Sequence, residues 1–280
     1  MLRKLMKHEF RATLRLMIPL YLVTLVLAVG AWIMTELTSR IAGDGPAWDM
    51  ITFIMGMTCI GAILALVVVP CMTVVLMILR FRSNLMADEG YVMFTLPVSN
   101  HQLVWSKLLV SLVWLVGAFV VDVLAMCIMS MGVDIWAGLF DLFRAITEAF
   151  AEYPGDAALL TVEILVLVVL AAFVFCLRFY APLAIGHSFA RHKLLLSVVF
   201  YFVISIATNM AAGVFLIFGV NPAGLLGNIM TSRVYMMIST MTEVQILHAG
   251  MWLYIGILAV YGVILYCITM RMLNHRLNLE

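Results

Sequence analysis

The sequence predicts an all-α integral membrane protein with six transmembrane helices, and two observations predict this fold class. Of the 280 residues, 65% are apolar and only 11% are charged, and the mean hydropathy is +1.15. Soluble domains carry about 25% charged residues, so this chain has too few to cover a water-facing surface. A soluble enzyme and a disordered chain are both excluded. The apolar residues also form six runs of about 20 residues or more, the length that spans a bilayer.

The six predicted spans cover residues 16–34, 50–79, 104–131, 157–176, 194–220 and 246–270. We expect them to form one transmembrane permease domain over residues 1–280, in contact with the lipid bilayer. Basic residues concentrate on the cytoplasmic side of membrane proteins. Of the 16 Lys and Arg, 13 precede the first span, follow the sixth, or fall between the second and third or fourth and fifth spans. Both termini are therefore expected in the cytoplasm, in a multi-pass protein of the cell (plasma) membrane.

The segment before the first span, residues 1–15, has an amphipathic pattern. Apolar residues recur at intervals of three or four on one face, and basic residues take the other: Leu2, Leu5, Met6, Phe10 and Leu14 against Arg3, Lys4, Lys7, Arg11 and Arg15. We expect an interface helix whose basic face meets anionic headgroups. Two alternatives stay open: a basic flank that only sets topology, or a signal peptide formed with the first apolar run.

The longest predicted cytoplasmic connection, residues 80–103, contains apolar residues and helix-boundary signals that a flexible linker would not need. It exposes an apolar and aromatic group unless another surface covers it: Tyr91, Met93, Phe94 and Leu96. Such a group indicates a docking surface, or packing back onto the base of the bundle. Pro97 ends one element, and Ser99 with Gln102 forms a capping box that begins the next helix.

Two predicted extracellular connections, residues 132–156 and 221–245, are longer than simple turns. The first has apolar residues at helical spacing, so we expect a helix on the outer leaflet. The second has few charges and could dip into the membrane as re-entrant helices near a pathway.

Three polar residues within the predicted spans are candidates for a functional site. Asp122 and Glu163 lie at similar depths on antiparallel spans, where a charge is costly and indicates a functional site. They could form part of a transport pathway, share a proton, pair with Arg144 or Arg233, or face water. Asn209 is a weaker pathway candidate, because one amide can also join helices.

Catalytic and metal-binding motifs are missing from the sequence. No phosphate-binding G-x-x-x-x-G-K-[ST] loop, H-E-x-x-H or G-x-S-x-G motif occurs. The histidines are scattered, and His187 and His192 are more simply explained by an interfacial turn than by a metal site. We therefore expect a chain that is not an enzyme, without a cofactor, metal or nucleic-acid partner of its own.

The stretch Gly90-Tyr-Val-Met-Phe-Thr-Leu-Pro-Val-Ser99, followed by His101-Gln-Leu-Val-Trp-Ser-Lys107-Leu-Leu, resembles the permease subunits of type-2 ATP-binding-cassette (ABC) exporters of Gram-positive, Clostridia-like bacteria. Three weaker matches lie at Lys7-His-Glu-Phe10, at Ala184-Ile-Gly-His-Ser-Phe-Ala-Arg-His-Lys193 and at Leu277-Asn-Leu-Glu280. The likeness runs in order along the whole chain.

The resemblance implies a permease half that pairs with a second copy or a sibling and recruits two copies of a cytosolic ABC ATPase, which binds ATP and magnesium. It places the coupling helix of that family at about residues 85–96. The residues expected to contact the ATPase are Asp88, Glu89, Tyr91, Phe94, Leu96 and Pro97. A second, smaller cytoplasmic contact is expected at His187, Arg191 and His192. The cargo, and the choice between homodimer and heterodimer, are not implied.

Other functions are also compatible with these residues. The first alternative is a proton-coupled secondary transporter that uses Asp122 and Glu163. A membrane-embedded hydrolase or a passive sensor or anchor subunit comes next, and the hydrolase is disfavoured because no nucleophile and base pair is evident.

Overall fold

A computed structural model describes residues 2–40, 43, 45–86, 95, 97–131, 135–152, 154–189, 191–220 and 241–275. These residues form helices and no strand: α1 (Leu2–Arg40), α2 (Pro46–Met86), α4 (Asn100–Met129), α5 (Ile135–Glu152), α6 (Pro154–Gly186), α7 (Lys193–Val220) and α9 (Glu243–His275). All except α5 contain a segment long and apolar enough to cross a membrane, which makes 6 candidate spans. The predicted fold class, an all-α protein with six membrane-spanning helices, is confirmed.

The chain divides into two compact units. Unit 1 consists of Met1–Phe81 and Pro97–Glu152, and unit 2 consists of Arg82–Leu96 and Tyr153–Glu280. Unit 1 therefore holds α1, most of α2, α4 and α5, whereas unit 2 holds the last turn of α2 with α6, α7 and α9. Whether they act as one permease domain stays a prediction.

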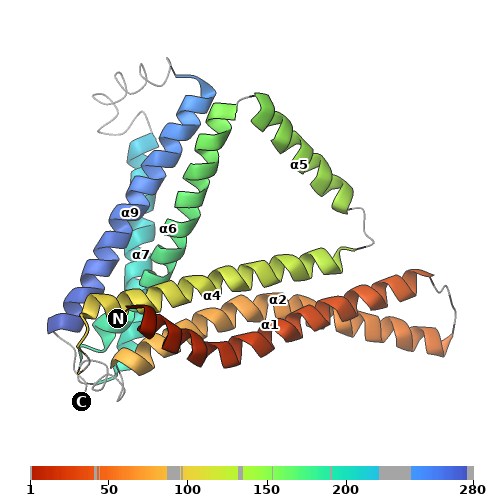
Figure 1. The fold of residues 1–280 in the computed structure, drawn as a ribbon, viewed down its shortest axis with the longest axis horizontal. Helices are drawn as coiled ribbons and strands as arrows, with labels where there is room; N and C mark the ends of the chain where they lie inside the picture. The colour runs from red at the N-terminus through yellow and green to blue at the C-terminus, as the bar shows by residue number, and fades with distance from the viewer. Residues whose placement is uncertain are drawn as a thin grey trace. The chain divides into compact units, whose positions relative to one another are not determined.

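In unit 1, α1 is a single bent helix of 39 residues, and it packs along α4 (Figure 1). At about 1.5 Å per residue, α1 is roughly 58 Å long, about twice the thickness of a hydrocarbon core. Residues 2–15, expected as an interface helix, are helical and continue without interruption into the span, and their position at the membrane interface stays a prediction. Pro19 lies within α1 and provides a physical cause for the bend.

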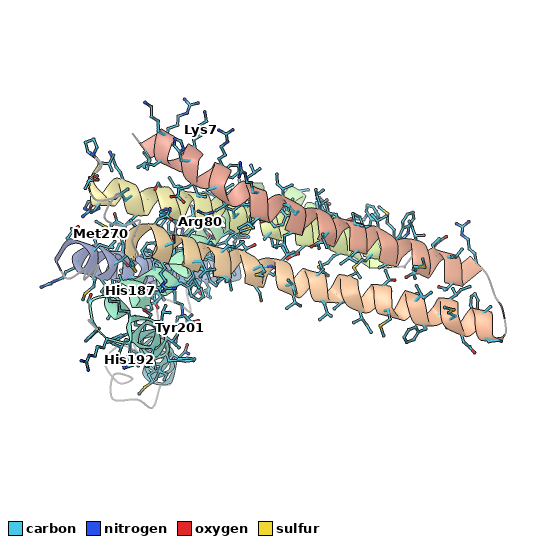
Figure 2. All side chains as sticks on the ribbon, turned by 90° about the horizontal axis from the view of Figure 1, so that it is seen from below. Lys7, Arg80, His187, His192, Tyr201 and Met270 are labelled. Atoms are coloured by element: carbon cyan, nitrogen blue, oxygen red, sulfur yellow. The ribbon has the colours of Figure 1, made fainter. Side chains whose placement is uncertain are left out.

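The apolar face of the first turns of α1 packs against protein. Met17, Val110 and Trp114 form a buried cluster, and the residues packed on it include Met6, Phe10 and Leu14. The basic residues on the opposite face are exposed: Arg3, Lys4, Lys7, Arg11 and Arg15. Figure 2 shows Lys7 pointing away from the helices that α1 packs on. The apolar side of this amphipathic pattern therefore packs against protein, and its basic side forms a cationic surface.

The spans carry large apolar side chains on their outer surfaces. Val26 and Phe119, for example, are 68% and 69% exposed within the chain. Continuous apolar surface of this kind needs lipid around it, because water would make its exposure unfavourable. The helices of both units therefore contact the lipid bilayer.

In unit 2, α6 packs against both α7 and α9 (Figure 1). Two glycines allow α6 to approach its neighbours closely: Gly262 of α9 and Gly186 at the end of α6. A Cβ atom on Gly262 would lie 2.9 Å from the Cγ2 atom of Val174, and a Cβ atom on Gly186 would lie 2.5 Å from the backbone nitrogen of Ser197. Small residues at such crossings let helix backbones approach in membrane proteins.

The helix expected between residues 132 and 156 is present as α5. Its aromatic residues Phe140 and Phe143 are 69% and 70% exposed. The position of α5 at the outer leaflet stays a prediction, and the connection at residues 221–245 lies almost entirely outside the described residues.

Candidate functional site

A buried ion pair joins the start of α1 to the start of α4. Glu9 Oε1 accepts a hydrogen bond from Lys107 Nζ, and the two side chains are only 9% and 4% exposed. Arg80, near the end of α2, donates from Nη2 to the carbonyl oxygen of Ala12 at 3.1 Å. These contacts hold the polar ends of three helices together, at the end of unit 1 that is predicted to be cytoplasmic.

Trp114 reinforces this junction about two turns further along α4. Its ring stacks on Phe10 with 4.8 Å between centroids and an interplanar angle of 11°. Its Nε1 atom donates to Thr13 Oγ1 at 2.7 Å, and its backbone carbonyl accepts from the Tyr21 hydroxyl at 2.9 Å. Trp114 thus makes both apolar and polar contacts with α1, and we define Glu9, Thr13, Arg80, Lys107 and Trp114 as the base cluster.

Sequence reasoning missed the base cluster, although one signal was present. Glu9 stands four residues after Leu5 and four before Thr13, on the apolar side of α1 rather than its basic side. An acid at such a position predicts a buried partner, because an unpaired charge there would be unfavourable. The partner itself, Lys107, is 98 residues away and follows no local pattern.

The residues expected to contact the ATPase lie mostly outside the described part of the chain: Asp88, Glu89, Tyr91, Phe94 and Leu96. Pro97 is described and exposed. Ser99 caps α4, and its Oγ atom accepts from the backbone nitrogen of Gln102 at 3.4 Å. The predicted start of a helix after residues 85–96, the expected coupling segment, is therefore confirmed.

The turn between α6 and α7 contains the second predicted contact. His187 is only 3% exposed, and its Nδ1 atom lies 2.9 Å from the carbonyl oxygen of Leu183, an acceptor, so Nδ1–H donates. His187 is thus part of the packing of unit 2 and not of its surface. Arg191 and His192 are exposed, and His192 adopts a left-handed backbone with φ of 56° (Figure 2).

Lowering the pH is expected to destabilise unit 2 through His187. Burial lowers the pKa of His187 from its ordinary value of 6.5; the hydrogen bond to Leu183 opposes this, and the charges of Arg82 and Lys193 add to it. The folded state then binds fewer protons than the unfolded state, so stability is full above about pH 6.5 and falls as the pH drops below it. The free energy of unfolding, measured from about pH 8 to about pH 5, should fall more steeply in the wild type than in His187→Gln. The exposed His192→Gln should keep the wild-type slope, and equal slopes in all three proteins would contradict this role.

Glu163 has a partner that was not expected. Its side chain is completely buried on α6, and its Oε2 atom lies 2.8 Å from Nδ1 of His248 on α9, whose side chain is 12% exposed. The pair lies within unit 2 and inside two predicted spans. Nothing in the spacing of the sequence distinguished His248 from the other histidines.

The other two intramembrane candidates have different surroundings. Asp122 on α4 is half-buried, and its Oδ1 atom is buried without a hydrogen-bond partner among the described residues. Asn209 on α7 is exposed. Asp122 belongs to unit 1 and Glu163 to unit 2, so each acid is described within its own unit.

Within the described residues, no three metal-ligating side chains come together. The chemistry available there is an ion-paired junction at the base of unit 1 and a hydrogen-bonded acid and imidazole within the spans of unit 2.

No family model, curated protein or solved structure matches the chain. What these residues establish is a membrane protein with six helices that can cross the bilayer.

Proposed function

We propose that this chain is the membrane-spanning permease subunit of an ATP-driven ABC exporter. It pairs with a second copy or a sibling, and two cytosolic ATPase subunits bind ATP and magnesium. The sequence resemblance around residues 90–109 suggests this function. The observation that carries it further is the base cluster, which fixes α4 to α1 directly after the coupling segment.

A coupling segment needs a stiff element to act on. The first turns of α4 meet this need, because Leu103, Val104 and Leu108 are each no more than 2% exposed. The base cluster joins these turns to α1, so a force on residues 85–96 would move both helices as one body. Closely packed helices transmit such a displacement because they do not deform continuously.

The division of the chain also supports this mechanism. The chain passes from one unit to the other at the proposed coupling segment, because α2 ends at Met86 in unit 2 and Pro97 belongs to unit 1. We propose that ATP-driven closure of the ATPases pushes this segment, tilts α2 and α4, and opens an outward route between two permease copies.

Replacing both Tyr91 and Phe94 with aspartate should abolish co-purification of the ATPase. Aromatic anchors of interfaces commonly contribute about 2 kcal/mol or more each, so the loss of affinity should exceed roughly 30-fold for one residue and be larger for two. The measurement is pull-down of the ATPase by the tagged permease in detergent. The matched control is Phe140→Asp with Phe143→Asp on α5, which removes two exposed aromatic residues elsewhere and should leave binding intact. An ATPase that stays bound and coupled to the aspartate variant would contradict the docking assignment.

A proton-coupled secondary transporter is the second candidate, and the pairing of Glu163 with His248 is the observation that favours it. The two mechanisms respond differently to energy sources. Export should continue when an ionophore collapses the proton gradient in the presence of ATP, and should stop when the ATPase is absent. Transport that collapses with the ionophore and persists without any ATPase would favour the secondary transporter.

A further inference from the structure

The Glu163 and His248 pair has the composition of a site that exchanges a proton. Glu163 is 0% exposed, and its Oε2 atom bonds to His248 Nδ1 at 2.8 Å. Both residues lie on helices of unit 2 that pack directly on each other, so their distance is a property of one compact unit. Acids and histidines within membrane spans are rare because charge is unfavourable there, and they commonly mark ion or proton sites.

The second carboxylate oxygen of Glu163 and the second ring nitrogen of His248 are both buried without a hydrogen bond in the described part of the chain. Neither Oε1 of Glu163 nor Nε2 of His248 has a partner among the described residues. An acceptor left unpaired in a buried position costs roughly 1–3 kcal/mol. These two atoms are therefore positioned to accept a proton or a hydrogen bond from a small ligand.

We propose that Glu163 and His248 form a proton-binding site within the membrane-spanning helices of unit 2. In the empty state, Nδ1–H of neutral His248 donates to the carboxylate of Glu163, Nε2 holds a lone pair, and the pair carries one negative charge. A proton taken from water forms an N–H bond at Nε2. The imidazolium and the carboxylate then sum to zero charge, which a medium of low dielectric constant favours over a net charge.

Other titratable groups on the three helices of unit 2 are separated from this pair along the chain. The nearest along the chain are Asp156, seven residues before Glu163, and Glu243 and Tyr254, five residues before and six after His248. At 1.5 Å per residue, these separations are about 7–10 Å along a helix. The remaining groups on α6 and α9 are at least 13 residues away, and α7 carries only Lys193 and Tyr201, within its first nine residues. The proton is therefore assigned to the pair itself, with Asp156 as the carboxylate to use as a control.

The test uses the full chain in a phospholipid membrane, without any ATPase, and with its histidine rings labelled with ¹⁵N. NMR follows the ring nitrogens between about pH 5 and pH 8, and the signal missing from His248→Gln identifies His248. We expect Nε2 of His248 to change from unprotonated to protonated as the pH falls, with uptake of one proton at this pair. In Glu163→Gln this uptake should be lost over the same range, whereas Asp156→Asn should retain it.

Two results would overturn the proposal. The first is a wild-type Nε2 that keeps one protonation state throughout the pH range, a measurement that needs no variant to fold. The second is a Glu163→Gln protein, folded by circular dichroism, in which His248 titrates as in the wild type. The proposal does not rest on ATP-driven export, because failure of the ATPase to bind would leave this titration unchanged.

Discussion

Replacing Lys107 with methionine is expected to destabilise the protein by about 3–5 kcal/mol, the range measured when one partner of a buried ion pair is removed. Methionine fills most of the space of the lysine stem but removes the Lys107 ammonium from the Glu9 carboxylate, whose side chain is only 9% exposed. The measurement is the midpoint of thermal unfolding in detergent, together with the yield of monodisperse protein.

Two further variants separate the ion pair from general effects of losing a charge. Lys4→Met removes an exposed lysine from the same end of unit 1 and should change stability by no more than about 0.5 kcal/mol. The double variant Glu9→Gln with Lys107→Met removes both charges and should recover most of the loss, because replacing a whole buried pair is often neutral. A single variant no less stable than Lys4→Met, or a double variant no better than the single one, would contradict a buried pair at this junction.

Replacing Gly186 with alanine is expected to destabilise the turn between α6 and α7 by about 3 kcal/mol or more, at the upper end of overpacking effects. The added Cβ atom would lie 2.5 Å from the backbone nitrogen of Ser197 and 2.7 Å from its Cα atom, and would also meet its Oγ atom. Rotation of a side chain cannot relieve a clash with backbone atoms, so the start of α7 would have to move. The measurements are the same unfolding midpoint and monodisperse yield.

The control for this variant is Gly256→Ala on α9, where nothing lies within 4 Å of the added Cβ atom. Its stability should be unchanged or slightly higher, because alanine favours helix more than glycine does. Combining Gly186→Ala with Ser197→Ala should not rescue the fold, because the clashing backbone atoms remain. Rescue by that double variant would show that only the Ser197 hydroxyl limits the space.

Local features of the fold could be predicted because they depend on neighbouring residues. A run of about 20 apolar residues specifies a span wherever it occurs, since a helix satisfies its own backbone in the bilayer. Ser99 begins α4 for an equally local reason, because its hydroxyl accepts from a nitrogen three residues ahead. The apolar face of residues 2–15 packs on Trp114 and Val110, a contact that local pattern does not reveal because both partners belong to another helix.

The two polar sites depend on contacts across the chain. Glu9 and Lys107 are 98 residues apart, and Glu163 and His248 are 85 apart. Which partner each acid meets depends on the rotation of one helix against another, and the periodicity of either helix alone does not contain that information. His187 shows the same limit, since the resemblance implied a cytoplasmic contact at this residue, whereas packing within unit 2 buries it.

By itself, the sequence determined that this protein is helical, embedded in a membrane and built on six spans. Long apolar runs are stable only in lipid, and a helix satisfies its own backbone hydrogen bonds there. The sequence also identified Glu163 as a group that must have a function or a partner. Only the tertiary structure decided that the partner is His248, that α1 and α4 are joined through Glu9 and Lys107, and that Glu163 Oε1 and His248 Nε2 are buried without a hydrogen-bond partner among the described residues. The physical reason is that the sequence of one helix shows that a charged residue will be buried. The side chain that stabilises this charge belongs to another helix, and only packing determines which one it is.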